Sequence, residues 1–231
     1  MNIYFLVEGD QTERKVYPIW LKYLVPRLVR VNCCDDVVKN HYYLACGGGF
    51  PSIIDVHLNN AVTDVNEHGN FDYLILCLDV DDSTPEDLVQ LIHKNFQENR
   101  IGLVSTQLVI IFQNKCFETW FLGNRKIFKR NPSNQQLRKY ITHYNVLEDD
   151  PENMPKTDDF KGSTSYFHSD YFRLICRERN CRYSKEHPGL VTENSFLDEL
   201  VARFQETKHV PSFGRFVLFC EYIHSQISEV A

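Results

Sequence analysis

The sequence predicts an α/β fold in which a mostly parallel four-stranded sheet is flanked by helices and followed by a helical C-terminal extension. Short apolar runs such as Ile3–Val7 and Tyr73–Leu78 have the length and composition of buried strands. Helical patterns lie between these runs, and an alternation of strand and helix is typical of a parallel sheet. Acidic residues follow the strands directly, and the carboxyl ends of parallel strands form the edge of the sheet where ligands usually bind.

A helix is expected after the first strand. Gly9 allows a tight turn, and Asp10–Glu13 resembles a capping box, in which polar side chains satisfy the free N–H groups of the first helical turn. Pro26 ends this helix, because proline has no N–H to donate. The apolar residues expected on its buried face are Val16, Ile19, Trp20, Tyr23 and Leu24.

Glycine and proline mark the boundaries that follow. Leu28–Val31 and His41–Cys46 are expected to form two short strands or one interrupted strand. The run Gly47–Gly49 predicts a turn with close backbone approach, and a second helix is expected from about Pro51. This glycine run lacks the lysine and hydroxyl residue that end a P-loop, so it does not match a nucleotide site.

Two further strands lead into carboxylates. Tyr73–Leu78 runs into Asp79 and Asp81, and Val104–Phe112 leads to Glu118. Between these strands, a helix through Phe96 has clear start signals, which are Ser83, Thr84, Pro85 and Glu86. Asp82 is interpreted as an N-cap of that helix.

Beyond about residue 124 the pattern is helical. We therefore expect residues 1–124 to form the sheet-bearing domain and residues 125–231 a helical extension that packs on it. Helices are expected at Asn134–Tyr144, Thr164–Arg177, Ser195–Gln205 and Gly214–Ile227. The acidic, proline-bearing stretch Glu148–Gly162 predicts a loop or a mobile flap.

Composition narrows the class of protein. The chain has 231 residues, of which 43% are hydrophobic and 24% charged, as is ordinary for a globular protein. No apolar run approaches the roughly 20 residues needed to cross a bilayer. The N-terminus has no basic lead, and Glu8 interrupts its apolar run, so we expect a strand instead of a signal peptide and a cytoplasmic protein.

The net charge of -6 argues against a uniformly basic nucleic-acid coat, but not against a nuclease. Acidic catalytic groups lower the net charge, while basic residues still gather locally. One such cluster is Arg125, Lys126, Lys129 and Arg130, and a second is Arg173, Arg177, Arg179 and Arg182. Each is interpreted either as a solvated helix face or as a surface that follows phosphates.

The eight cysteines are scattered through expected strands and helices, which indicates reduced, buried thiols and not a disulfide framework. Neither Cys33-Cys34 with Cys46 nor Cys176 with Cys181 has the paired short spacing of a structural zinc site. None of the nine histidines falls in a paired ligand pattern.

The carboxylates at the strand ends point to a hard metal ion. Clustered carboxylates repel one another unless a cation joins them, and oxygen ligands on rigid strand ends suit Mg²⁺ or Mn²⁺. We expect Glu8, Asp79 and Asp81 to hold such an ion.

The order of these motifs resembles the Toprim domain of topoisomerases, bacterial primases and OLD-family nucleases. The resemblance rests on Val7-Glu8-Gly9 and Asp79-Val80-Asp81, at the ends of two strands. Small Toprim proteins of the RloB kind share further motifs, found here as Thr12-Glu13, Phe117-Glu118 before an aromatic stretch, and Tyr183-Ser184-Lys185 with Gly189.

This resemblance implies a Toprim-like, Rossmann-like sheet and a Mg²⁺- or Mn²⁺-dependent nuclease that cuts DNA or RNA. Glu8, Glu118 and Lys185 would be catalytic, with Glu118 completing a second metal site or orienting water and Lys185 offsetting phosphate charge or assisting proton transfer. It also implies a role in antiphage defence or a mobile element. Any partner ATPase would be a separate subunit, because this chain has no P-loop.

Other interpretations remain open. A non-catalytic Toprim-fold subunit that binds nucleic acid or a partner would use the same sheet edge, and nucleotidyl transfer would use the same metal. Glu8 as a helix cap and Glu118 as a structural hydrogen-bonding residue are the alternatives for single acids. The C-terminal helix is expected in the core instead of at a homodimer face, through Phe213, Phe216, Phe219, Tyr222 and Ile223.

Overall fold

The computed structural model describes residues 1–229, and the chain divides into two compact units. The first, here called the sheet unit, comprises Met1–Leu78, Ser83–Phe112 and Phe216–Ala231. The second, here called the helical unit, comprises Asp79–Asp82 and Gln113–Arg215. Both units are therefore built from segments that are discontinuous in sequence, and the domain boundary expected at residue 124 stays a prediction.

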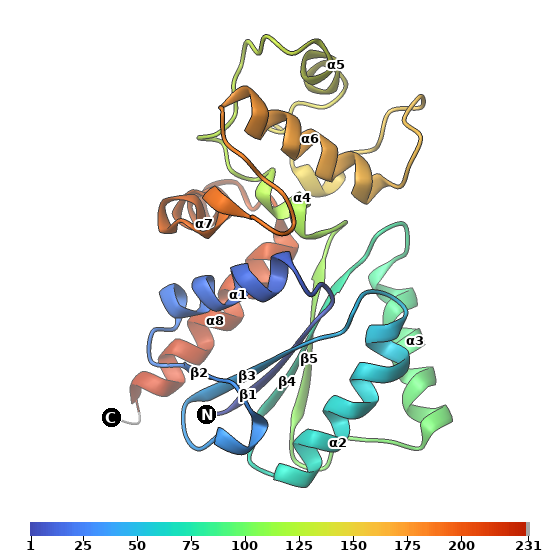
Figure 1. Ribbon diagram of the computed structural model, residues 1–231, viewed down its shortest axis with the longest axis vertical. Coiled ribbons are helices and arrows are strands. Elements are labelled where there is room, and N and C mark those ends of the chain that lie inside the picture. The colour runs from blue at the N-terminus through green and yellow to red at the C-terminus, as the bar shows by residue number, and fades with distance from the viewer. Residues whose placement is uncertain (230–231) are drawn as a thin grey trace. The chain divides into compact units, whose positions relative to one another are not determined.

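The sheet has five parallel strands in the order β2-β3-β1-β4-β5 (Figure 1). They are β1 (Ile3–Val7), β2 (Val29–Val31), β3 (His41–Cys46), β4 (Tyr73–Asp79) and β5 (Gln107–Gln113). The expected α/β fold with a parallel sheet is confirmed, whereas the expected count of four strands is wrong. β2 and β3 are separate neighbours, with Val29 opposite His41, and they do not form one interrupted strand.

β1 lies at the centre of the sheet. All five of its residues are buried, as expected for a parallel strand covered on both faces. Its last residue, Val7, is opposite Cys46 of β3 and Cys77 of β4. The carboxyl ends of these three strands therefore reach the same edge of the sheet.

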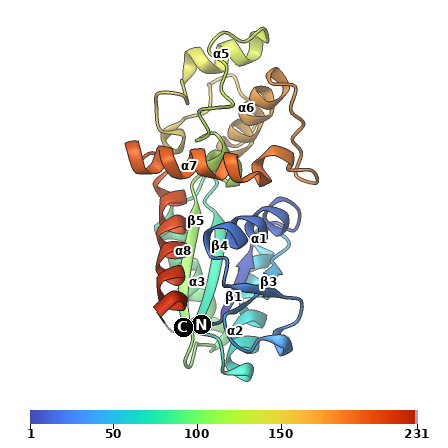
Figure 2. The ribbon, with the colours of Figure 1, turned by 90° about the vertical axis from the view of Figure 1, so that its left-hand side faces the viewer.

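Helices cover both faces of the sheet (Figures 1 and 2). α1 (Thr12–Leu24) and the part of α8 (Pro211–Glu229) that belongs to the sheet unit lie on one face. Tyr17 and Trp20 of α1 pack against Phe216 of α8. On the other face lie α2 (Leu58–His68), which continues from a π-helical turn over Ile53–His57, and α3 (Pro85–Asn99).

The buried face of α1 differs from the expected one. Val16, Tyr17, Trp20 and Leu21 are buried, whereas Ile19 is 38% exposed and Tyr23 is 43% exposed. The buried stripe is rotated because Tyr17 packs between Phe5 of β1 and Phe216 of α8. For α8 the expected core position is confirmed at Phe213, Phe216 and Ile223, which are all buried, but it is wrong for Tyr222, which is 45% exposed, and Phe219 is half-buried.

α3 starts as its sequence predicts. The Thr84 hydroxyl accepts a hydrogen bond from the Asp87 N–H at 3.1 Å, and Pro85 occupies the first turn. The helix runs beyond Phe96 to Asn99, where Arg100 adopts a left-handed conformation with φ 53°. By contrast, α1 starts at Thr12 with no side-chain cap at Gln11, so the capping box expected at Asp10–Glu13 is wrong.

The helical unit contains the helices expected beyond residue 124. They are α5 (Gln135–His143), α6 (Thr164–Glu178), α7 (Asn194–Thr207) and the first residues of α8, preceded by the short α4 (Phe117–Phe121). α4 and α6 pack together through rings, with the centroids of Phe121 and Phe172 5.3 Å apart. Aromatic pairs of this kind stabilise a fold by more than the burial of their apolar surface area accounts for.

The stretch Glu148–Gly162 is a loop apart from a short 3-10 helix at Pro151–Asn153, and its first part is packed, whereas the expectation of a mobile flap stays a prediction. Its side chains at Pro151, Glu152 and Met154 are buried. The Glu152 carboxylate accepts hydrogen bonds from the Ser212 hydroxyl at 2.6 Å and the Asn114 amide at 3.2 Å. Burial raises the pKa of Glu152 to about 7.

Two further expectations concern thiols and membranes. All eight cysteines are free, but only Cys77, Cys116, Cys176 and Cys220 are buried, so the expectation of buried thiols is half correct. Among the described residues, no helix has both the length and the apolar character that crossing a membrane requires.

Candidate functional site

Glu8 follows β1, and two backbone hydrogen bonds from the glycine run Gly47–Gly49 hold the chain there. The Gly47 N–H donates to the Val7 carbonyl at 2.8 Å, and the Gly49 N–H donates to the Glu8 carbonyl at 3.0 Å. The Glu8 side chain is 9% exposed. The glycine run expected to approach the backbone closely does so here, beside the candidate metal ligand.

Gly9 lies in close contact with the carboxylate of Glu13. The Gly9 N–H donates to Glu13 Oε1 at 3.0 Å, and a Cβ on Gly9 would overlap the Glu13 carboxylate. The absence of a Cβ on Gly9 therefore lets the Glu13 carboxylate approach the backbone. Gly9 is not needed for its backbone conformation, because its φ is not positive. Glu13 has the structural role that replaces the expected capping box, because it fixes the turn that carries Glu8.

The segment after β4 is tied to the segment after β5. The Val80 N–H donates to the Gln113 carbonyl at 3.0 Å, and the Asp81 N–H donates to the Lys115 carbonyl at 2.8 Å. Asp81 is exposed and left-handed, with φ 50°. These bonds extend the pairing of the two segments beyond the ends of the strands and set the backbone positions of Asp79 and Asp81.

Asp82 has a different capping role from the expected one. α3 is capped by Thr84, as described above, whereas Asp82 Oδ1 accepts a hydrogen bond from the Thr164 N–H at 3.3 Å. Thr164 is the first residue of α6, so Asp82 acts at the start of that helix. A carboxylate is favourable there because the N-terminus of a helix carries partial positive charge.

Asp79 and Glu118 both act on one buried thiol. Burial raises the pKa of Cys116 well above its usual range, and the negative charges of Glu118 and Asp79 raise it further. Asp79 is the last residue of β4, and Glu118 lies in α4 beyond β5, so the two acids that influence this thiol follow different strands.

Glu118 is 3% exposed and is joined to the Tyr183 side chain. The Tyr183 hydroxyl donates to Glu118 Oε1 at 2.9 Å. The Tyr183 ring packs edge-on against Phe172, with centroids 4.8 Å apart. The motifs around Phe117-Glu118 and Tyr183-Ser184-Lys185 are therefore in contact, although they are far apart in sequence.

Lys185 lies in a turn of the helical unit and is exposed. The Ser184 N–H donates to the His187 carbonyl at 3.1 Å, and the His187 N–H donates back to the Ser184 carbonyl at 3.0 Å. These reciprocal bonds close the turn around Lys185. Gly189, which completes the motif, has φ 56°, a conformation that glycine adopts readily.

A buried histidine supports the turn that carries Glu118. His168 Nε2 donates to the Met154 carbonyl at 2.8 Å, so His168 Nδ1 is the acceptor for the Thr119 hydroxyl, also at 2.8 Å. The Thr119 oxygen in turn accepts the N–H groups of Lys115 and Cys116, each at 3.2 Å. Burial lowers the pKa of His168 to about 4, which keeps the ring neutral.

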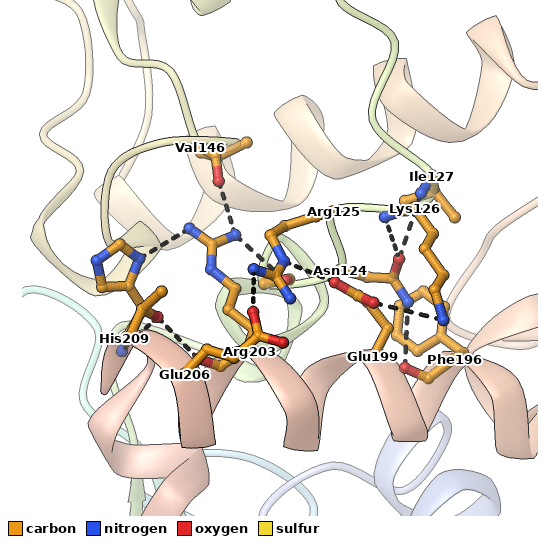
Figure 3. Close-up of polar contacts among 12 residues, drawn as sticks. Asn124, Arg125, Lys126, Ile127, Val146, Phe196, Glu199, Arg203, Glu206 and His209 are labelled. Carbon is orange, nitrogen blue, oxygen red and sulfur yellow. Dashed lines mark hydrogen bonds and ion pairs between the residues drawn. The ribbon is translucent and has the colours of Figure 1, made fainter.

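Three of the four residues of the first basic cluster form ion pairs within the helical unit, and Figure 3 shows those of Arg125 and Lys126. Arg125 forms ion pairs with Glu199 at 2.6 Å and Glu206 at 2.7 Å. Lys126 also pairs with Glu199, and Lys129 pairs with Glu178 at 2.8 Å. This cluster therefore has a structural role, and the expectation that it follows phosphates has no support in its contacts.

Sequence reasoning missed Cys116, Tyr183 as a partner of Glu118, and the His168 support. Cys116 gave no signal in the sequence, because cysteine is not among the residues that usually mark the start of a helix. The pairing with Tyr183 and His168 had no local signal, since these residues come from distant parts of the sequence.

The proposed metal ligands have the right chemistry, since carboxylate oxygens suit hard divalent ions. Glu8 belongs to the sheet unit, and Asp79 and Asp81 belong to the helical unit. In the part of the chain that the structure describes, no three histidine, cysteine or acidic side chains are grouped so that they could hold a metal ion. A shared site formed by these three acids is therefore a proposal.

Comparison with protein-family models, with curated proteins and with solved structures finds no match to this chain. The functional argument accordingly depends on the residues and their contacts.

Gly9→Ala is expected to lower the free energy of unfolding by about 1–3 kcal/mol, because the new Cβ displaces the Glu13 carboxylate. Urea denaturation measures this change. Gly102→Ala is the matched control, since a Cβ there meets nothing within 4 Å. Equal effects of the two substitutions would show that the contact between Gly9 and Glu13 does not constrain the turn.

His168 is expected to make stability depend on pH below neutrality. Its pKa in the folded chain is about 4, against 6.5 for the ordinary side chain, so the unfolded chain takes up a proton first as the pH falls. Stability is therefore lost between about pH 6.5 and pH 4, by an amount on the order of 3 kcal/mol.

Urea denaturation at several pH values tests this dependence. In His168→Gln the loss of stability over this range is expected to be smaller by that amount. The exposed His93→Gln variant is the control and is expected to follow the unaltered chain. A His168→Gln profile parallel to that of the unaltered chain would contradict the assignment of a neutral, buried ring.

Proposed function

We propose that the chain is a divalent-metal-dependent nuclease that hydrolyses phosphodiester bonds of DNA or RNA. Glu8, Asp79 and Asp81 would hold Mg²⁺ or Mn²⁺, and Glu118 and Lys185 would assist the reaction. The observation that carries the proposal is the backbone pairing of the segment that follows Asp79 with the segment that leads from β5 to Glu118, through Val80 N–H to the Gln113 carbonyl and Asp81 N–H to the Lys115 carbonyl.

A bound divalent ion supplies charge neutralisation at the phosphate and a water of lowered pKa. Glu118 would orient an attacking water and accept its proton. Tyr183 occupies Glu118 Oε1 and fixes the direction of the carboxylate, which leaves Oε2 as the atom that would receive the proton. Lys185 would offset negative charge on the scissile phosphate from its closed turn.

The Toprim resemblance extends this proposal to a biological setting. It favours defence against phage or a role in a mobile element, together with a separate ATPase subunit. The order of the motifs from Val7-Glu8-Gly9 to Tyr183-Ser184-Lys185 supports this extension.

A second candidate function is a non-catalytic subunit that binds nucleic acid or a partner. It is favoured by the finding that the described residues contain no group of three side chains arranged for a metal ion. The two candidates differ in whether Asp79 is needed for a chemical step or is dispensable.

Asp79→Asn is expected to lower the rate of nucleic-acid cleavage by about 100-fold or more, because a carboxylate that would hold the charge-neutralising metal ion is lost. The assay offers single- and double-stranded DNA and RNA with Mg²⁺, Mn²⁺ or EDTA. Glu67→Gln, at an exposed position on α2, is the control for loss of a surface carboxylate. Circular dichroism checks that each variant is folded.

Cleavage by Asp79→Asn at the rate of the unaltered chain would contradict the nuclease proposal. Binding of nucleic acid without cleavage, unchanged in Asp79→Asn and Glu8→Gln, would favour the binding subunit instead.

A further inference from the structure

The helical unit has a concave surface lined by basic side chains. Arg173, Arg177, Arg182, Tyr183 and His187 line a depression with a volume of about 510 Å³, here called the arginine depression. Sites for small ligands have volumes of roughly 300–1,000 Å³, so the arginine depression is large enough for part of a nucleotide chain.

Three guanidinium groups converge there from two segments. Arg173 and Arg177 are four residues apart on α6 and so lie on the same face of that helix. After α6 the chain turns at Asn180, which has φ 55°, and the Cys181 N–H donates back to the Cys176 carbonyl at 2.9 Å. This turn brings Arg182 to the same depression.

The positive charge of the arginine depression is not neutralised. In the described part of the chain, Arg173, Arg177 and Arg182 form no ion pair, and no acidic side chain lines the depression. Of the two acids on the same helix, Glu178 is bound by Lys129 and Ser133, and Asp170 accepts a hydrogen bond from the Tyr140 hydroxyl at 2.9 Å. The fourth arginine of the cluster, Arg179, donates to the carbonyls of Ile127 and Phe128 and has a structural role.

Tyr183 links the arginine depression to the candidate catalytic acid. Its ring lines the depression and packs against Phe121 and Phe172, while its hydroxyl donates to Glu118 Oε1. A ligand in the depression would therefore be one side chain away from Glu118. Arginine binds phosphate oxygens with paired N–H donors, and aromatic rings stack on unpaired bases.

We propose that the arginine depression binds a single strand of DNA or RNA through its phosphate backbone and positions that strand beside Glu118. The inference rests on the proposed nuclease function, which it deepens by assigning the surface that receives the substrate. Arg173, Arg177 and Arg182 contact phosphates, and the Tyr183 ring contacts a base.

The test measures binding separately from cleavage. Fluorescence anisotropy follows the full-length chain with a labelled single-stranded oligonucleotide in EDTA, so that metal-dependent cleavage does not occur. Arg173→Gln/Arg177→Gln is expected to weaken binding by about tenfold and to reduce the slope of log affinity against log salt by about 1.4, for two lost phosphate contacts on a single strand. Arg182→Gln is expected to reduce the slope by about 0.7.

The control is Arg27→Gln/Lys39→Gln, which removes the same charge from exposed positions in the sheet unit. It is expected to leave the affinity and the salt slope within error of the unaltered chain. Equal weakening by the two double variants would attribute the effect to net charge and overturn the proposal. A base-free polyphosphate that competes as well as an oligonucleotide of equal charge would overturn the assignment to nucleic acid.

Tyr183→Phe separates this inference from the nuclease proposal. It keeps the ring, so oligonucleotide binding is expected to be unchanged, but it removes the bond to Glu118, so cleavage is expected to fall. Unchanged binding in Arg173→Gln/Arg177→Gln would refute the arginine depression as the strand site, even if the chain cleaves nucleic acid. Weakened binding in a chain that does not cleave would support the depression and refute the nuclease.

Discussion

The arrangement of the candidate acids in the helical unit depends on two backbone hydrogen bonds. The Val80 N–H donates to the Gln113 carbonyl, and the Asp81 N–H donates to the Lys115 carbonyl. They join the segment that follows β4 to the segment that leads into α4. Asp79 is the last residue of β4 and Glu118 lies in α4, so this pairing links the two parts of the backbone that carry these acids.

Neutral, buried side chains hold the turn that carries Glu118 in place. Thr119 accepts the two N–H groups of the turn and donates its hydroxyl to His168, whose other nitrogen donates to Met154. The low pKa of His168 means that this support carries no charge at neutral pH.

Much of the fold follows from the sequence, because strands and helices have local signals. The apolar run over Tyr73–Asp79 and the cap at Thr84 are examples, and the helices beyond residue 124 lie close to their expected positions. β2 was not separable from β3, because Val29–Val31 is short and exposed and becomes a strand only by pairing with β3. The contact of Glu13 with Gly9 was likewise mistaken for a capping box, since both use a glutamate early in the helix.

The candidate site was predictable in part. The acids at the strand ends could be named from sequence, but their partners could not, because Tyr183 and His168 come from distant segments. The two basic clusters look alike in sequence, and only the contacts of Arg125 with Glu199 and Glu206 distinguish a neutralised cluster from the arginine depression.

Binding of Mn²⁺ in the absence of nucleic acid tests the central claim most directly. Titration calorimetry of the unaltered chain is expected to show saturable Mn²⁺ binding, and Asp79→Asn and Glu8→Gln are each expected to weaken it by about tenfold or more. Mn²⁺ binding that is unchanged in both variants, or an unaltered chain that binds no Mn²⁺, would contradict the account.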